Sequence, residues 1–265
     1  MKIVVCVKFV PDATADRRFR PGDNTVDRAG VDGLLSELDE NAVEAALAIK
    51  EAGSGDGPGT EVTVLTVGPE QAADAVKKAL QMGADAGVHV VDDAIQGSDA
   101  VATSLVLATA LGKLEHDLVV FGMESTDGAM GVVPAMVAER LGLPAVTLGS
   151  EVTVGGSTVR IRRDGDVSSD TVEGTLPLVL SVTDAANEPR YPSFKGIMAA
   201  KKKPVQTWAL SDLGLSADEV GGSVAWSQVT GVTARPPRSA GTVVTDSDGT
   251  GAAQLVEFLS SNKFL

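Results

Sequence analysis

The sequence predicts an α/β protein, with a doubly wound and mainly parallel sheet between two layers of helices. The first half of the chain alternates short β-branched runs with segments of helical periodicity, the pattern of successive strand–helix units. Of the 265 residues, 43% are hydrophobic but only 3% are aromatic. A core of small aliphatic side chains suits close packing of helices on a sheet, and the length allows one large domain or two small ones.

Four apolar runs in the first half are expected as buried strands, each followed by a helix. The first strand is KIVVCVKFV, and the helix after it has Asp39 or Asn41 as its N-cap and Gly53 as its stop. Pro134 fits the last of these helices only in its first turn. The strands are expected at 2–10, 61–68, 86–93 and 117–124, and the helices at 37–53, 69–83, 98–114 and 131–142.

The pattern changes near residue 144, where helical periodicity gives way to strands and turns. Residues 144–184 are expected to complete the sheet, with antiparallel strands at its edge, so that residues 1–184 form one α/β domain. Residues 185–265 are expected to form an extended C-terminal arm with one or two short helices. Its stretch 232–251 is rich in Pro, Gly, Ser and Thr and cannot bury enough surface to offset its ordering entropy. The arm therefore wraps its own domain or clasps another chain.

Charge and cysteine usage narrow the function classes. A formal net charge of -14 would repel a phosphate backbone, so no nucleic-acid partner is expected. The single cysteine, Cys6, cannot form an internal disulfide, and the opening residues lack the pattern of a signal peptide. No apolar run approaches the roughly 18 residues of a membrane span. These features favour a soluble protein of the reducing cytoplasm.

The most informative segment for binding is GMESTDGAMGVVPAM, residues 122–136, which runs from the end of the fourth strand into a helix. Ligands bind at the carboxyl ends of parallel strands, and the N–H groups of a helix start favour phosphate. Ser125 and Thr126 add hydroxyl groups, and Asp127 can accept a donor or cap the helix. The alternative is an ordinary strand–helix turn. Small residues that allow close backbone approach are Gly122, Ser125, Gly128, Ala129 and Gly131.

Other candidate sites are weaker. GSGDGPG, residues 53–59, follows a helix and contains no lysine, so it is interpreted as a linker and not as a phosphate loop. His89 lies within a strand and His116 precedes one. Together with Cys6 they give neither a metal-ligand spacing nor a nucleophile with its base. We expect no catalytic residues and no metal.

The segment SVTDAANEPRYPSFKGIMAAKKKP, residues 181–204, resembles the beta subunit of electron-transfer flavoproteins. The family motif joins a strand ending in Val-Thr to Asn-Glu-Pro-Arg-Tyr, then Ile-Met and a lysine cluster. The resemblance extends over nearly the whole chain, including residues 5–12, the first helix and the turn at 122–144. It implies an adenine nucleotide alpha hydrolase-like domain that pairs with an alpha subunit. The alpha subunit holds most of the FAD, and the beta subunit binds AMP structurally.

The resemblance also implies which residues form the AMP site. Many family members carry Gln-Thr before the last helix, and this chain does not, so phosphate binding would depend on main-chain amides, Ser125 and Thr126. Electron-bifurcating relatives bind a second FAD in this position, which leaves AMP and FAD as alternatives. The implied site consists of Cys6, Ser36, Glu37, Leu38, Asp39, Val67, Gly122, Met123, Glu124, Ser125, Thr126, Asp127, Gly128, Ala129, Met130, Gly131 and Val132.

In this family the loop after Asn-Glu-Pro-Arg-Tyr binds partner dehydrogenases. We call residues 187–203 the docking loop, in which Phe194 would enter a hydrophobic pocket of the partner and the lysines would steer the encounter. The alternative is that Phe194, Ile197 and Met198 pack on the domain and the lysines solubilise the tail. The implied partner-binding residues are Tyr191, Phe194, Ile197, Met198, Lys201, Lys202 and Lys203.

The function that the resemblance implies is electron transfer without bond-making catalysis. Acyl-CoA dehydrogenases and other dehydrogenases would reduce the FAD of the heterodimer. A membrane-bound quinone oxidoreductase would then take the electrons toward the respiratory chain. A free-standing nucleotide-binding regulator of the stress-protein type is the alternative, but it gives residues 185–265 no role. An ATP-using ligase or hydrolase would need a Gly-rich pyrophosphate loop after the first strand, where this chain has VKFVPDATAD.

Overall fold

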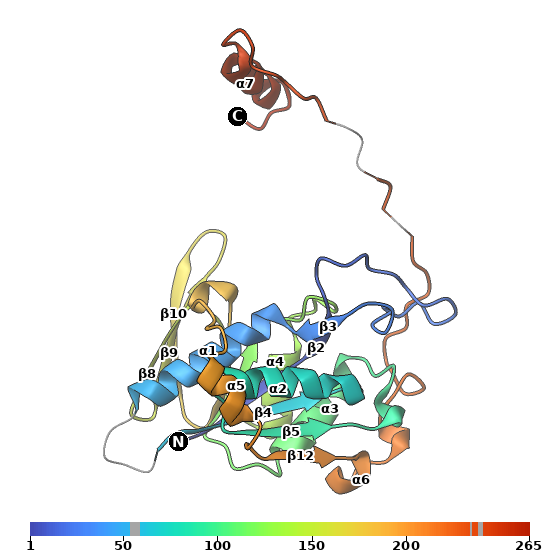
Figure 1. The fold of residues 1–265 in the computed structure, drawn as a ribbon, viewed down its shortest axis with the longest axis vertical. Coiled ribbons are helices and arrows are strands. Elements are labelled where there is room, and N and C mark those ends of the chain that lie inside the picture. Colours follow the sequence, from blue (N-terminus) through green and yellow to red (C-terminus); the bar gives the residue numbers. More distant parts are fainter. Residues whose placement is uncertain (54–58, 234, 238–240) are drawn as a thin grey trace. The chain divides into compact units, whose positions relative to one another are not determined.

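The computed structural model describes residues 1–53, 59–233, 235–237 and 241–265. Its centre is a seven-stranded sheet in the order β12-β5-β4-β1-β6-β11-β7 (Figure 1). All its neighbouring strands pair in parallel, which confirms the predicted type of sheet. The strands are β1 (Lys2–Val7), β4 (Glu61–Val67), β5 (Ala86–Val90), β6 (Leu118–Gly122), β7 (Ala145–Gly149), β11 (Leu178–Val182) and β12 (Val205–Trp208).

Helices cover both faces of this sheet, so the predicted three layers are confirmed. One face packs against α1 (Glu37–Ala52) and α2 (Ala73–Met82), the other against α3 (Ala100–Leu111) and α4 (Val133–Leu141). Pro134 lies in the first turn of α4, as its chemistry requires. Single turns of 3-10 helix, Glu70–Ala72 and Asp93–Ile95, precede α2 and α3.

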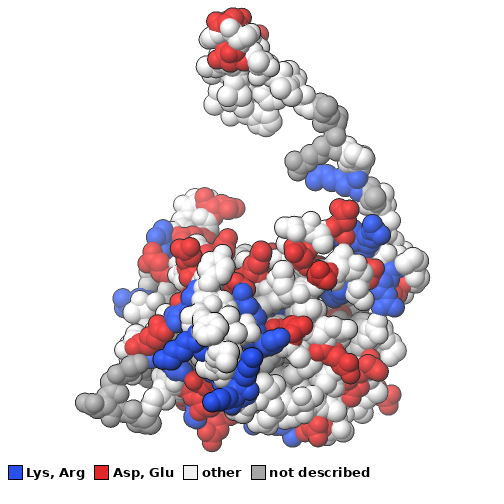
Figure 2. Space-filling model, in the orientation of Figure 1, with Lys and Arg blue, Asp and Glu red and all other residues white. Residues whose placement is uncertain are grey.

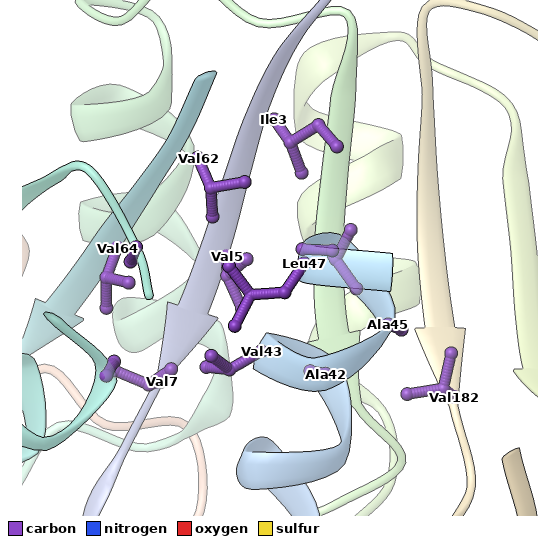
Figure 3. Packing of buried hydrophobic residues seen from close by; sticks show 14 of the residues in the cluster. Ile3, Val5, Val7, Ala42, Val43, Ala45, Leu47, Val62, Val64 and Val182 are labelled. Atoms are coloured by element: carbon purple, nitrogen blue, oxygen red, sulfur yellow. The ribbon is translucent and has the colours of Figure 1, made fainter. Parts of the chain in front are cut away.

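The core has two halves because successive side chains of a strand point to opposite faces. Ile3, Val5 and Val7 of β1 pack toward α1 and α2, whereas Val4 and Cys6 pack toward α3 and α4. Figure 3 shows the first half, where valines of β1 and β4 lie against side chains of α1. A strand buried on both faces is apolar throughout, which explains the continuous run IVVCV.

The predicted strand 2–10 is in fact two strands. β1 ends at Val7, and after Lys8 the chain continues as β2 (Phe9–Pro11), which pairs antiparallel with β3 (Gly33–Leu35). The break occurs because the backbone N–H of Lys8 donates to the Asp39 carboxylate at 2.8 Å instead of to a neighbouring strand.

Residues 144–184 complete the sheet, but their antiparallel strands do not form its edge. β7 and β11 join the main sheet in parallel. Between them, β8 (Glu151–Gly155), β9 (Thr158–Asp164) and β10 (Ser169–Thr175) form a separate antiparallel sheet. Val159 and Ile161 of β9 belong to the same buried cluster as Val146 of β7, so the small sheet is part of the core.

Beyond residue 184 the chain first returns to the main sheet. After a 3-10 turn, Asp184–Ala186, it forms α5 (Phe194–Ala200), β12, α6 (Leu210–Leu213) and a second 3-10 turn, Ala217–Glu219. Sequence analysis missed β12, because Val-Gln-Thr-Trp is a short strand at an exposed edge.

By its internal contacts the chain divides into residues Met1–Thr230 and Gly231–Leu265, and the second unit contains α7 (Gly251–Ser261). The region 185–265 therefore holds α5, α6 and α7, more helix than the sequence predicted. In the described part of the chain, no helix has both the length and the apolar character needed to span a membrane. Residues 54–58, interpreted as linker, lie outside the described residues.

Candidate functional site

A cavity of about 270 Å³ lies at the carboxyl ends of β1, β4 and β6. The chain adds β4 and β5 on one side of β1 and then β6 on the other, so strand order reverses beside β1. Parallel sheets bind ligands at this kind of reversal. The volume lies just below the roughly 300–1,000 Å³ usual for small-molecule sites. We call this cavity the strand-end pocket.

Ten of the seventeen predicted cofactor residues line the strand-end pocket. The remaining predicted residues belong to the same segments but do not line the cavity: Ser36, Glu37, Leu38, Thr126, Asp127, Ala129 and Val132. Ser36 is fully buried, and its Oγ has no hydrogen-bond partner within the described chain. The predicted residues that line the pocket are Cys6, Asp39, Val67, Gly122, Met123, Glu124, Ser125, Gly128, Met130 and Gly131.

Sequence analysis missed part of the lining. Ser98, Asp99, Ala100 and Thr103 come from the start of α3. The Asp99 carboxylate accepts from Ala102 N at 3.0 Å and is the N-cap of that helix. Asp99 follows the third predicted strand, and the carboxyl ends of all strands of a parallel sheet lie at the same edge. This position could therefore have indicated that Asp99 lies near the pocket. The other missed lining residues are Val7, Lys8, Arg28, Leu107, Phe121, Val133 and Pro134.

Asp39 connects two of the strand ends that frame the pocket. Its Oδ2 accepts from Lys8 N at 2.8 Å, just after β1, and its Oδ1 accepts from Gly122 N at 3.3 Å, at the end of β6. Burial raises the pKa of Asp39 to about 7, although these two N–H groups favour the charged form. At Gly122 a Cβ would lie 2.6 Å from both Asp39 Oδ1 and the Leu38 carbonyl oxygen, so only glycine fits.

Asp127 holds two cations at the mouth of the pocket. Its Oδ1 lies 2.8 Å from Lys8 Nζ and its Oδ2 lies 2.6 Å from Arg28 Nε, while its side chain is only 2% exposed. Burial alone would raise the pKa of Asp127, but the charges of Lys8 and Arg28 hold it well below its usual range. Lys8 Nζ also donates to Ser125 Oγ at 3.2 Å. The turn after β6 is thus tied to β1 and to the β2–β3 loop.

The start of α4 faces the same pocket. Its N-cap residue, Val132, provides no side-chain cap, and Val133 and Pro134 line the cavity. Gly131 has φ +64 and Ala129 has φ 47, both in the left-handed region that suits glycine best. These dihedrals turn the chain sharply just before the helix, where Gly128, Met130 and Gly131 line the cavity. The arrangement can accept an anionic group on backbone amides.

The predicted partner-binding residues lie on the α5 segment, outside the strand-end pocket. Tyr191 is 91% exposed and Phe194 is 80% exposed, and Ile197 and Met198 are also exposed. The Phe194 ring is therefore not packed into the domain, contrary to that alternative. Lys201 and Lys202 are exposed as well, and basic side chains gather on this face of the molecule (Figure 2).

Lys203 differs from its neighbours. Its Nζ donates to the Leu80 carbonyl of α2 at 2.9 Å, and its partial burial lowers its pKa. The predicted cluster of three lysines therefore presents Lys201 and Lys202 to solvent, while Lys203 holds the end of the docking loop against α2.

Comparison with known proteins assigns the family. The family model described as "Electron transfer flavoprotein domain" matches residues 23–213. The electron transfer flavoprotein subunit beta of Mycobacterium tuberculosis is 48% identical over 264 residues, 99% of each chain. The subunit of the same name from Clostridium acetobutylicum is 35% identical over 100% of both chains. The caffeyl-CoA reductase-Etf complex subunit CarD of Acetobacterium woodii is 36% identical over 92% of both. Family model and full-length similarity agree with the residues that carried the resemblance, and the chain belongs to the electron transfer flavoprotein family as a beta subunit.

Proposed function

We propose that this beta subunit binds one AMP in the strand-end pocket and pairs with an alpha subunit that holds most of an FAD. Acyl-CoA dehydrogenases and other dehydrogenases reduce the heterodimer, which passes the electrons toward the respiratory chain through a membrane-bound quinone oxidoreductase. The observation that carries the nucleotide part is the cavity at the strand-order reversal, with the start of α4 opening into it. The lone buried Cys6 suits a cytoplasmic location.

The pocket fits a mononucleotide better than a dinucleotide. At about 270 Å³ it has room for a single base, ribose and phosphate, whereas FAD contains a second nucleotide-sized half. Val7, Val67, Leu107 and Phe121 offer apolar contacts for an adenine ring. AMP is therefore the ligand we propose, and a second FAD is the alternative that the ligand analysis below separates.

The phosphate would be held at the start of α4. Backbone amides of residues 128–133 and the hydroxyl of Ser125 are the donors we assign to it, together with the positive end of the helix dipole. Lys8 and Arg28 lie at the pocket mouth, where Asp127 already balances part of their charge. The role of Asp127 in this proposal is to fix the turn, because its side chain faces these cations and not the cavity.

An FAD bound to the heterodimer would supply the redox chemistry. This chain contributes surfaces to that process and no bond-making catalysis. Its docking loop presents Phe194 and Lys201 to donor dehydrogenases, and residues 231–265 bind the alpha subunit. The exposed apolar side chains of α7, Leu255, Val256 and Phe258, fit such a contact.

The test is co-expression with the alpha subunit encoded in the same genome, followed by gel filtration and ligand extraction. We expect a yellow heterodimer that releases one FAD and one AMP, identified by mass spectrometry. Two FAD per heterodimer would replace AMP in the proposal. A colourless beta chain that never pairs with the alpha subunit would refute the electron-carrier function.

A further inference from the structure

The docking loop is packed against the domain. It lies in the connection between β11 and β12, strands at different places in the same sheet, and crosses the outer side of α1 and α2 (Figure 1). Helix α5, which begins at Phe194, packs on α2. Contacts on both sides of Phe194 fix this crossing to the two helices below it.

Arg190 makes the strongest of these contacts. Its Nε and Nη2 lie 2.7 and 2.8 Å from the two carboxylate oxygens of Glu44, and its Nη1 lies 2.5 Å from Glu51 Oε1. The Arg190 backbone N–H also donates to Glu44, at 3.1 Å. Hydrogen bonds to Glu44 and then Glu51 raise the pKa of Arg190. Glu44 is only 12% exposed and Arg190 is 33% exposed, so this bidentate pair is partly sheltered from water and stronger than a fully exposed ion pair.

Two asparagines fix the chain just before Arg190. Asn41 Nδ2 donates to the Asn187 carbonyl at 2.9 Å, and Asn187 Nδ2 donates to the Asn41 carbonyl at 3.0 Å. Asn41 is buried in α1, so the exchange leaves both amides satisfied where water is excluded. Through Asn187 and Arg190, the motif Asn-Glu-Pro-Arg-Tyr is thus bound to α1 at Asn41, Glu44 and Glu51.

The other side of Phe194 is fixed to α2. A Cβ on Gly196 would overlap the Gln81 carbonyl oxygen, so glycine is what lets α5 lie directly on the end of α2. Ser193 Oγ accepts from Gly196 N at 3.1 Å and caps α5. Lys203 closes the segment with its hydrogen bond to Leu80.

We infer that Arg190 and Gly196 are positioning residues for partner docking, which hold an exposed Phe194 in one orientation before the partner arrives. The inference depends on the proposed role of Phe194 as the docking side chain. A loop whose backbone is already ordered loses less conformational entropy on binding, so the fastened loop strengthens docking although Arg190 and Gly196 do not touch the partner. Replacement of Arg190 should weaken docking and leave the flavin chemistry unchanged.

The experiment is a double-mutant cycle on the heterodimer. An acyl-CoA dehydrogenase from the same organism, reduced by its acyl-CoA, is the electron donor. The heterodimer is the acceptor whose concentration is varied, and the absorbance of its flavin gives kcat and the KM of the dehydrogenase for the heterodimer. We expect Phe194→Ala and Arg190→Ala each to raise KM, Arg190→Ala by about tenfold, with kcat and FAD content unchanged. In the Phe194→Ala background, Arg190→Ala should raise KM no further, because it acts through that ring.

The controls separate this inference from the proposed function. Arg160→Ala removes an exposed ion pair between Arg160 of β9 and Glu173 of β10 and should leave KM unchanged, whereas Gly196→Ala should raise it. A normal KM in Phe194→Ala would overturn the proposed docking role itself. If Phe194→Ala raises KM but Arg190→Ala does not, or raises it equally in both backgrounds, the positioning role is wrong. Should Arg190→Ala fail to assemble, Glu51→Gln takes its place in the same cycle.

Discussion

Asp39 places a buried carboxylate at the junction of β1, β6 and α1. Its raised pKa has a consequence for stability, because the folded protein keeps this proton to about pH 7 while an unfolded Asp releases it near pH 4. Between these values the native state binds more protons than the unfolded state, so the group's contribution to stability falls as pH rises.

Asp39→Asn should remove this pH dependence. The free energy of unfolding of the wild-type chain should fall relative to that of the variant between pH 4 and pH 7, by at most about 4 kcal/mol. Urea denaturation at several pH values measures the difference. Asp12→Asn is the control: Thr14 lowers the pKa of that exposed carboxylate, so its contribution is instead lost as pH falls. Parallel pH profiles for wild type and Asp39→Asn would contradict the assignment.

Gly122→Ala tests the contact between the end of β6 and the start of α1. Its Cβ would meet the Leu38 carbonyl and the Asp39 carboxylate, and backbone cannot move aside as a flexible side chain can. We expect a loss of about 1–3 kcal/mol in the free energy of unfolding, typical of overpacking, measured by urea denaturation. Gly155→Ala meets no atom within 4 Å and should leave stability nearly unchanged; equal losses in both would refute the steric explanation.

Sequence patterns found some of these residues and not their partners. The resemblance named Asp39 and Gly122, but nothing in the sequence shows that Lys8 N, 31 positions away, completes the contact. Arg28 was missed for the same reason, since its pairing with Asp127 spans 99 positions. Such pairs depend on how the strands are ordered in the sheet, which a local pattern does not encode.

At the scale of elements, the turn into α4 is the segment that would present backbone amides to the proposed nucleotide. Gly131→Val should lower the AMP content of the purified heterodimer, because a β-branched residue is strained at φ +64 and the turn must change shape. Nucleotide extraction and mass spectrometry give the AMP to protein ratio.

Gly142→Val is the matched control for Gly131→Val. Gly142 ends the same helix at φ +65 with no atom within 4 Å of its Cβ position, so the backbone strain is similar but lies at the opposite end of α4. It should destabilise the chain and retain AMP. Loss of AMP from both variants would mean that strain in α4, and not the turn at the pocket, governs binding.

The elements that sequence predicted well are those whose own side chains specify them. The apolar runs of β1, β4, β5 and β6 are buried on both faces and alternate with helices, so their pattern alone indicates a parallel sheet. β12, in contrast, is not specified by its own side chains. Its Val-Gln-Thr-Trp has little apolar character and becomes a strand only because β5 offers an unpaired edge. The separate sheet β8–β10 likewise depends on packing that its alternating pattern does not specify.

On the scale of the whole molecule, the two units divide the proposed tasks. Removal of residues 231–265 should leave the free energy of unfolding of the isolated subunit within about 0.5 kcal/mol of that of the full-length subunit. The reason is that α7 has no buried residue, so no buried contact is lost. The truncated chain should fail to pair with the alpha subunit, since α7 exposes Leu255, Val256 and Phe258. Gel filtration with the alpha subunit and urea denaturation check the two halves of this prediction.

Phe258→Ala in the full-length chain is the companion variant to the truncation, because it removes one exposed apolar side chain of α7 without shortening the chain. It should weaken pairing without abolishing folding. Normal pairing of the truncated chain would show that Met1–Thr230 carries the subunit interface and would reassign the role of α7.

The connection from β11 to β12 joins two strands of the sheet that have four other strands between them. It is fastened at Asn187, Arg190, Gly196 and Lys203. Tyr191, Phe194 and Met198, between these points, are exposed. One short segment therefore separates the residues that fasten it to the domain from the exposed residues proposed to meet a partner. On the proposed docking role, Phe194 could be exchanged to suit a different dehydrogenase while the four fastenings keep the connection in place, so a change of partner would not require a change of the sheet or its helices.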